Sequence, residues 1–475
     1  MPVSDIMDIG RQGLAAERRA LETTSQNIAN ANTPGFSRQR PVLESRGENL
    51  QNGGLTLAGV ACEKVVRVHD AFLQNRVFDE SMQHGFLSAQ EGALRSLESL
   101  MSTKAQNLHE NITSFFKNVR ALSVNPDLAT AKQVTVDSLK EVTTGVRDLN
   151  SSLESLGNDL DLKLQAETRE ANGLGRELAN LNEKITTYEA GGQTVNELKD
   201  RRDTVVELLG KKLGFQRSVD EKGNVNLYAP GVGAFVAGNQ STTLEARREG
   251  TPDKRGELSL FLINDHGDAH EATESTQSGE MGGMLRVRNG TLNQLRRNLD
   301  AFSFQFSKSI NEVYQQGAGN AQRPALEGSE TAQGHASTLH LNPELEKNSG
   351  LFSAGLTEGM ATDNRLALKM VECEKAPLVM AGLEPNPGSP EGVPIGESVP
   401  ALIAHVGIET QNIGQEKEQQ DSVMEQLHNY KQSVSGVSLE EEALHMMQYQ
   451  NSFNAAAKTI KVGDELLKTL LTLKD

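Results

Sequence analysis

Tryptophan is absent from this sequence, and aromatic residues make up only 4% of its 475 residues. So few large aromatic side chains suit long helices with Leu, Val and Ala seams better than one large enzyme core. Cysteine is equally scarce. Cys62 and Cys373 are too few for a disulfide framework or a thiolate metal site, so we expect two small buried side chains.

Long apolar runs are also missing. Nowhere do eighteen apolar residues follow one another, as a membrane-spanning helix requires, and the N-terminal segment lacks the apolar core of a cleavable signal peptide. The net charge of -17 comes without a basic stripe, which argues against binding to nucleic acid. We therefore expect neither nucleic acid nor a membrane as a partner. Taken alone, this suggests a cytoplasmic protein, unless export uses a route that accepts an uncleaved polar N-terminus.

The two ends of the chain carry the same seven-residue apolar spacing. Near the N-terminus it includes Met7, Leu14, Leu21 and Ile28, and near the C-terminus it includes Leu439, Met446, Phe453, Ile460 and Leu467, with Tyr449 as a supporting position three residues after Met446. Such a repeat keeps a narrow apolar stripe on one side of a helix, and that side is satisfied by lying along another helix. Both ends are therefore predicted to be docking helices. The alternative is a bundle that the chain closes with its own two ends.

The middle of the chain predicts a mainly α protein. From Leu139 to Ile185 apolar residues recur every three or four positions, within a helical pattern over 128–190 that predicts one rod of roughly 60 residues, about 90 Å long. Gly173 and Gly175 weaken this pattern, so a break into two helices remains possible.

Two segments between the helices predict strands. Residues 36–69 are expected to be non-helical, and alternate apolar positions from Val60 to Val68 indicate a short half-buried strand. Further along, strand candidates flank a five-residue loop from Asp220 to Asn224, which is typical of a hairpin. A small β domain inserted into a helical protein is the expected result.

These patterns divide the chain into four parts. The predicted parts are terminal helices at 1–35 and 433–475, a helical rod-like body at 36–212, 280–318 and 360–432, an inserted β domain at 213–279, and a short residual insertion at 319–359. Prolines and glycines from 382 to 400 predict a surface linker, after which the helices resume at about Ala401. The long helices should be coiled-coil-like.

Catalytic patterns are hard to find in this sequence. The densest polar cluster, Asp265 to Glu271, could supply metal ligands, but its glycine and turn-forming residues place it on a loop where polar tips are normal. A phosphate-binding glycine loop, a nucleophile elbow and a metalloprotease histidine pair are all lacking. We predict no enzyme, no metal and no cofactor. An enzyme carried on the β domain is the alternative from another functional class.

Two terminal motifs resemble the bacterial flagellar axial proteins, the group of rod, hook and hook-associated proteins. The first, SQNIANANTPGFSRQ from Ser25, contains Asn27, Asn30, Asn32, Pro34 and Gly35. The second, SGVSLEEEA from Ser435, is followed by YQNSFNAAAKTI. Internal stretches narrow the resemblance to the hook-associated proteins of the hook–filament junction, namely NELKDRRD from Asn196, GNVNLY from Gly223 and GGML from Gly282.

The resemblance implies a structural subunit that joins hook to filament. Terminal helices from many copies would pack in the inner tube, with the stripe residues and the motif residues of the N-terminal signature as assembly residues. The implied partners are further copies of the chain, the hook protein, the next hook-associated protein toward the filament, and a cytoplasmic export chaperone on the C-terminal helix. The implied location is extracellular, on the flagellum, after type III export without a cleaved signal peptide. A hook or distal rod subunit would share the same ends and is the alternative.

Overall fold

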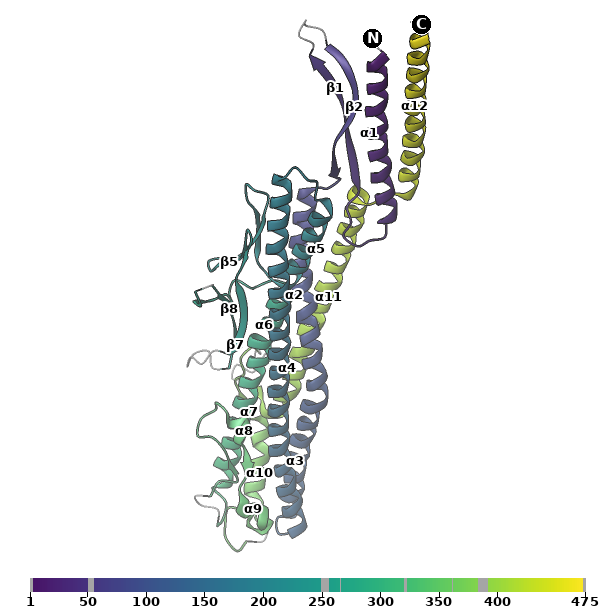
Figure 1. The fold of residues 1–475 in the computed structure, drawn as a ribbon. Coiled ribbons are helices and arrows are strands. Elements are labelled where there is room, and N and C mark those ends of the chain that lie inside the picture. The colour runs from purple at the N-terminus through teal and green to yellow at the C-terminus, as the bar shows by residue number, and fades with distance from the viewer. Residues whose placement is uncertain are drawn as a thin grey trace.

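The molecule is a long helical body with a smaller unit at one end, in which both chain termini lie (Figure 1). The computed structural model describes residues 3–49, 55–248, 256–264, 266–319, 323–360, 362–382 and 392–472. We call the smaller part the terminal unit: helices α1 (Val3–Ala29) and α12 (Leu439–Thr472), and the hairpin of β1 (Gln39–Asn49) and β2 (Leu55–Arg67). The predicted fold class, mainly α with long helices and a small β domain, is confirmed. Within the described part of the chain, every helix is too short or too polar to cross a membrane.

The body is built along α4 (Ala129–Ala190), a single helix of 62 residues. The predicted rod is confirmed, and neither glycine breaks it. Helix α2 (Ala71–Leu100) continues through the π-helical turn η1 (Met101–Ala105) into α3 (Gln106–Val124), and α11 (Ile395–Ser435) packs along both. Asp70 caps α2, because its side chain accepts hydrogen bonds from the backbone of Phe72 and Leu73.

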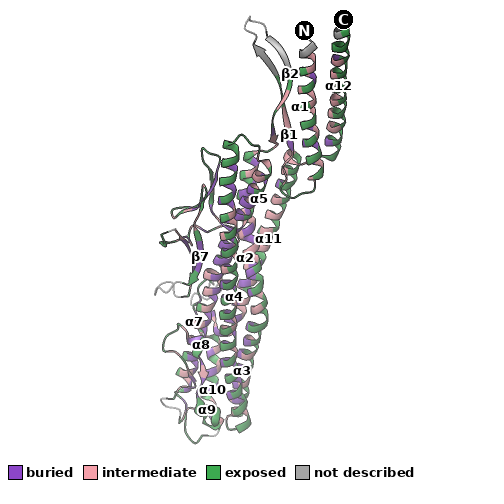
Figure 2. Ribbon diagram, in the orientation of Figure 1, coloured by how far each residue is buried: buried purple, intermediate pink, exposed green. Residues whose placement is uncertain are grey.

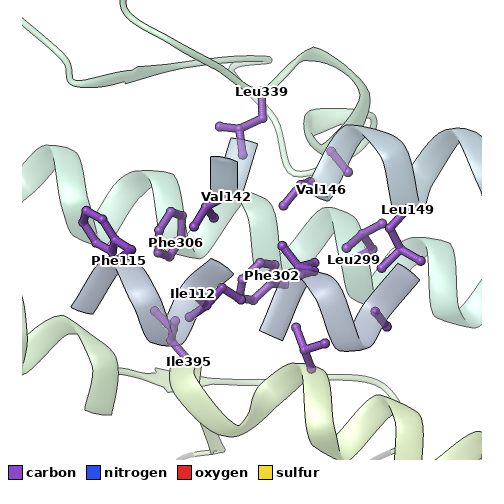
Figure 3. Packing of buried hydrophobic residues seen from close by; sticks show 14 of the residues in the cluster. Ile112, Phe115, Val142, Val146, Leu149, Leu299, Phe302, Phe306, Leu339 and Ile395 are labelled. Atoms are coloured by element: carbon purple, nitrogen blue, oxygen red, sulfur yellow. The ribbon is translucent and has the colours of Figure 1, made fainter. Parts of the chain in front are cut away.

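The half of the body farther from the terminal unit has an aromatic core (Figure 3). It forms where α3 and α4 meet α7 (Leu292–Tyr314), which follows α6 (Gly279–Leu285) and η3 (Arg286–Thr291). The rings of Phe115 and Phe306 meet edge to face with centroids 6.0 Å apart, and Phe302 stacks on Phe306 at 5.8 Å. Each such side chain contributes roughly 1.5–3 kcal/mol on full burial, so this core anchors the far end of the rod.

Small elements after α7 cover this core instead of forming a domain of their own. They are β10 (Leu326–Glu327), α8 (His335–Thr338), β11 (His340–Leu341), α9 (Pro343–Lys347), η4 (Ser349–Leu351), α10 (Arg365–Glu372), η5 (Cys373–Lys375), β12 (Pro377–Leu378) and β13 (Val393–Pro394). Leu339 and Phe352 are fully buried in the same cluster as Phe306. Among the described residues, the segment predicted as a residual insertion is thus part of the body.

The predicted β domain consists of two small antiparallel sheets. The first joins β3 (Gln216–Val219), β4 (Val225–Ala229), β5 (Gly233–Ala237) and β6 (Gln240–Ser241), and the second joins β7 (Thr243–Arg248), β8 (Leu258–Ile263) and β9 (Ala269–Glu271). Their apolar side chains share one cluster with α4, α5 (Asn196–Lys212) and α6; Phe235, for example, packs in it with Leu178 and Leu209. The sheets therefore complete the core of the near half of the body.

The start of α11 differs from the prediction. The helix begins at Ile395, so Pro400 lies inside it and not in a linker that ends there. A proline in the second turn removes one backbone hydrogen bond, and three apolar side chains offset the loss. Ile395, Val399 and Leu402 are each at most 2% exposed in the core. Of the rest of the predicted linker, Val393–Pro394 form β13, and residues 383–391 lie outside the described residues.

The strand prediction for residues 36–69 is right in kind and wrong in extent. Strands β1 and β2 form a long hairpin on α1, away from the helical body to which the sequence assigned this segment. The expected alternation fails as well, because Val65 is buried whereas Val60 is 40% exposed. The strands shift register between Val42 and Leu43 and again between Ser45 and Gly47, and each shift resets which side chains face inward.

Candidate assembly site at the joined chain ends

The two ends of the chain pack against each other in the terminal unit (Figure 1). Helix α1 is the middle layer, with the hairpin on one side and α12 on the other. The two helices run antiparallel, so that Gly10 lies against Ile460 and Gly13 against Ala456. The terminal helices thus contact each other within one chain, as in the alternative of a bundle closed by its own ends.

Glycine residues allow α1 and α12 to approach closely. A Cβ atom at Gly10 would lie 2.6 Å from Cγ1 of Ile460, and one at Gly463 would lie 2.9 Å from Cγ of Met7. Both distances are shorter than a van der Waals contact. The two helix backbones can therefore lie this close together only because these positions lack side chains. Although glycine weakens a helix, Gly10 and Gly463 therefore serve the contact between α1 and α12.

Gly10→Val is expected to destabilise the terminal unit by about 1–3 kcal/mol, because the added side chain overpacks the contact with α12. Gly173→Val in α4 is the matched control, since a Cβ there meets nothing within 4 Å. That variant should stay within about 0.5 kcal/mol of the parent, because valine and glycine differ little in helix propensity. Hydrogen exchange of the α1 and α12 amides gives the measurement. Equal protection in both variants would contradict the packing role of Gly10.

The predicted assembly residues occupy three environments. Half-buried in the terminal unit are Met7, Leu14, Leu21, Ile28, Asn30, Met446, Tyr449, Phe453 and Ile460. Asn27 is fully buried, whereas Asn32, Pro34 and Gly35 are exposed in the turn after α1. Leu439 and Leu467, at the two ends of the C-terminal stripe, are 53% and 38% exposed. An assembly role for all these residues stays a prediction.

A buried polar clasp joins the two terminal motifs. It consists of Asn27, Arg38, Gln39 and Glu442. Oδ1 of Asn27 accepts a hydrogen bond from the backbone N–H of Gln39 at 2.9 Å, and its Nδ2 donates to Oε2 of Glu442 at 3.0 Å. Nε of Arg38 donates to Oε1 of Glu442 at 2.8 Å. Glu442 is only 2% exposed, so its buried carboxylate depends on these donors.

The apolar spacing of the two ends does not predict three of the clasp residues, although all of them lie within the quoted motifs. The seven-residue spacing concerns apolar residues only, whereas Arg38, Gln39 and Glu442 are polar. An acidic residue in the first turn of a helix is normally a solvated N-terminal charge, so Glu442 carried no separate signal. The available signal was the pairing of an Arg in one motif with three consecutive Glu residues in the other.

Helix α5 ties the terminal unit to the body, and it begins with the NELKDRRD motif. Nη1 of Arg67, the last residue of β2, donates to Asp200 at 2.7 Å and to Asp203 at 2.9 Å. The backbone N–H of Ser37 also donates to Asp200, at 3.2 Å. Nδ2 of Asn196 donates to the backbone oxygen of Val65 at 3.1 Å. The motif therefore positions the hairpin relative to the body.

A cleft of about 1240 Å³ opens between the terminal unit and the body. Its walls are the turn at 31–38, one face of α5 at Thr204 to Lys211, and the C-terminal part of α11 from Asp421. Arg67, Asp200 and Asp203 lie outside its lining. The terminal unit is thus held at α5 and faces open space next to it.

The predicted polar loop gives no support for a metal site. Asp265 lies outside the described residues, and His266, Asp268 and His270 are exposed. Within the described ranges, the His, Cys, Asp and Glu side chains form no group of three or more that could hold a metal ion. Cys62 is half-buried and Cys373 is buried, and both are free thiols.

Three protein families match this chain. The family described as "Flagellar hook-associated protein FlgK helical domain" matches residues 94–325. "Flagella basal body rod protein" matches residues 7–36, and "Flagellar basal body rod FlgEFG protein C-terminal" matches residues 432–473. The two end matches coincide with the terminal helices and their motifs. Together with the joined ends, they define the class of the molecule as an axial structural protein of the bacterial flagellum.

Relatives over the whole length identify the family. "Flagellar hook-associated protein 1" of Bacillus subtilis is 25% identical over 98% of this chain and 97% of its own. The protein of the same name from Salmonella typhimurium is 22% identical over 99% of this chain and 100% of its own. The chain belongs to the FlgK family of flagellar hook-associated proteins, the structural proteins of the hook–filament junction. This membership favours the junction over a hook or rod subunit.

A solved structure has the same fold. "The structure of the flagellar hook junction protein FlgK from Burkholderia pseudomallei" superposes with a TM-score of 0.64 at 12% sequence identity. It covers 76% of this chain and 100% of that chain. The relatives are structural proteins of the flagellum, in agreement with the helical architecture described above.

Proposed function

We propose that copies of this chain assemble into the axial tube between hook and filament through the outer face of α12. The observation behind this proposal is the apolar surface that the helix leaves uncovered. Leu444, Met447, Val462 and Leu466 are 62%, 55%, 53% and 44% exposed, and Figure 2 shows exposed residues along the length of α12. Helix α1 packs on the other side of α12, so these side chains have room for a second molecule.

The outer face of α12 is distinct from the face that meets α1. Its four apolar residues lie on the side opposite the seven-residue stripe that includes Met446 and Phe453, and the polar residues Asn451 and Lys458 lie between them. Apolar residues on two opposite sides of one helix support two different contacts, one within the chain and one with a neighbour.

The contact should join unlike surfaces of neighbouring copies. If the outer face of α12 met itself across a two-fold axis, it would close a dimer, whereas a tube requires head-to-tail contacts that repeat around the axis. Each of the four apolar side chains contributes up to about 1.5–3 kcal/mol if it becomes fully buried. These residues are exposed in the single chain, so their substitution should spare its stability.

Val462→Asp tests this surface. We expect normal amounts of secreted protein, an unchanged melting temperature and loss of the protein from purified hook–basal bodies, because the charge would enter the contact between copies. Val134→Asp is the matched control, since this valine on α4 is 49% exposed. The control should be incorporated like the parent chain. Normal incorporation of the Val462 variant would place the assembly surface elsewhere.

The other partners of the chain and its export route follow from the same proposal. The hook protein and the next hook-associated protein would be the axial neighbours, and the chain would reach the outside through the flagellar type III apparatus. An export chaperone would bind the C-terminal helix, whose outer face offers apolar side chains before assembly covers them. We propose a structural role without enzymatic activity, supported by the relatives named above, which are structural proteins of the flagellum.

A further inference from the structure

We propose that Arg67, Asp200 and Asp203 form a latch that fixes the angle between the terminal unit and the body. When the latch is broken, the terminal unit can swing toward the cleft beside α5. This proposal concerns the single chain and does not depend on the assembly surface proposed above.

The covalent connections between the two parts are short. The chain passes from β2 to α2 through residues 68–70, and from α11 to α12 through residues 436–438, and neither segment is helix or strand. Two short irregular connections allow rotation, because a few backbone dihedral angles can absorb it. The angle between the parts must therefore be set by the contacts that the two parts make with each other.

The latch is positioned to set this angle. Arg67 directly precedes the first connection, and Asp200 and Asp203 are three residues apart on α5, where they share one face. The side chains of Arg67, Asp200 and Asp203 are only 9%, 8% and 14% exposed. Ion pairs this far out of water are weakly screened by salt, and loss of one partner leaves the other buried without its counter-charge.

The cleft gives the terminal unit room to rotate on one side of the latch. The turn at 31–38 forms one wall, and α5 and α11 form the others across about 1240 Å³ of open space. Across it, the backbone N–H of Arg38 donates to the oxygen of Ser435 at 2.9 Å, close to the second connection. A rotation about both connections would narrow the cleft without disturbing the aromatic core of the body.

Distances between two spin labels on the full chain measure the angle directly. Glu44→Cys on β1 and Ser155→Cys on α4 are exposed sites in the two parts, introduced together with Cys62→Ser. Cys373 can stay, because burial raises the pKa of its thiol to about 11 and keeps it unreactive at the labelling pH. Pulsed electron resonance then gives the distribution of distances.

We expect a single narrow distribution for the parent chain and at least twice its width for Arg67→Met. Arg201→Met is the matched control, because Arg201 lies on the same helix but pairs with Glu177 of α4, so that its ion pair joins two helices of the body. The control should keep the parent width. If Arg67→Met unfolds, the double variant of Asp200→Asn and Asp203→Asn removes the charges with little change of shape. An unchanged width in the folded latch variants would overturn the proposal.

Discussion

A strain that lacks this chain is expected to build complete hooks, to carry no filaments and to release filament subunits into the medium. The reason is that hook and filament subunits would have no common layer on which their two lattices meet. Electron microscopy of hook–basal bodies and immunoblots of the medium provide the measurements. Expression of the parent chain, or of its Val134→Asp variant, should restore the filaments. Filaments of normal number in the deletion strain would contradict the junction role.

Arg38→Met is expected to release α12 from α1, with a loss of about 3 kcal/mol in the stability of the terminal unit. The substitution leaves the carboxylate of Glu442 buried without its cation, and breaking one side of a buried ion pair typically costs about 3–5 kcal/mol. The exposed partner Glu441, 2.8 Å from the same guanidinium, contributes little to this loss. Limited proteolysis should then remove both ends of the chain and leave the body intact.

The double variant Arg38→Met with Glu442→Met separates charge from packing. It should be more stable than the single Arg38 variant, because two apolar side chains replace a charge without a partner. A single variant whose ends resist the protease like the parent chain would show that the clasp does not hold the terminal unit together.

The sequence predicted the helices well because their signal is local. The rod of α4 and both terminal helices follow from apolar residues three, four or seven positions apart, which share a helix face wherever the helix lies. The clasp could not be found in this way. Asn27 and Glu442 are 415 positions apart and polar, and only the antiparallel pairing of the two ends brings them together.

Other features escaped prediction because packing decides them. The β domain has its own strand pattern, but that pattern does not show that Leu178 of α4 and Phe235 of β5 share one cluster. The two register shifts in β1 could not be predicted from the sequence either, since a bulge depends on how the strand packs against α1. The seven-residue spacing does not reveal the outer face of α12, because the apolar residues of that face lie on the opposite side of the helix from the stripe.

The antiparallel pairing of the first and last helices also determines when the molecule can become complete. The body contains most of its contacts within residues 70–435, so it can form before the C-terminal helix is available, whereas α1 needs a partner that is the last segment of the chain. Contacts between segments this far apart in sequence form late, because a long loop must close first. In any process that delivers the chain from its N-terminus, the terminal unit therefore closes only after the final helix has arrived, and a truncated chain keeps its docking helix without a partner.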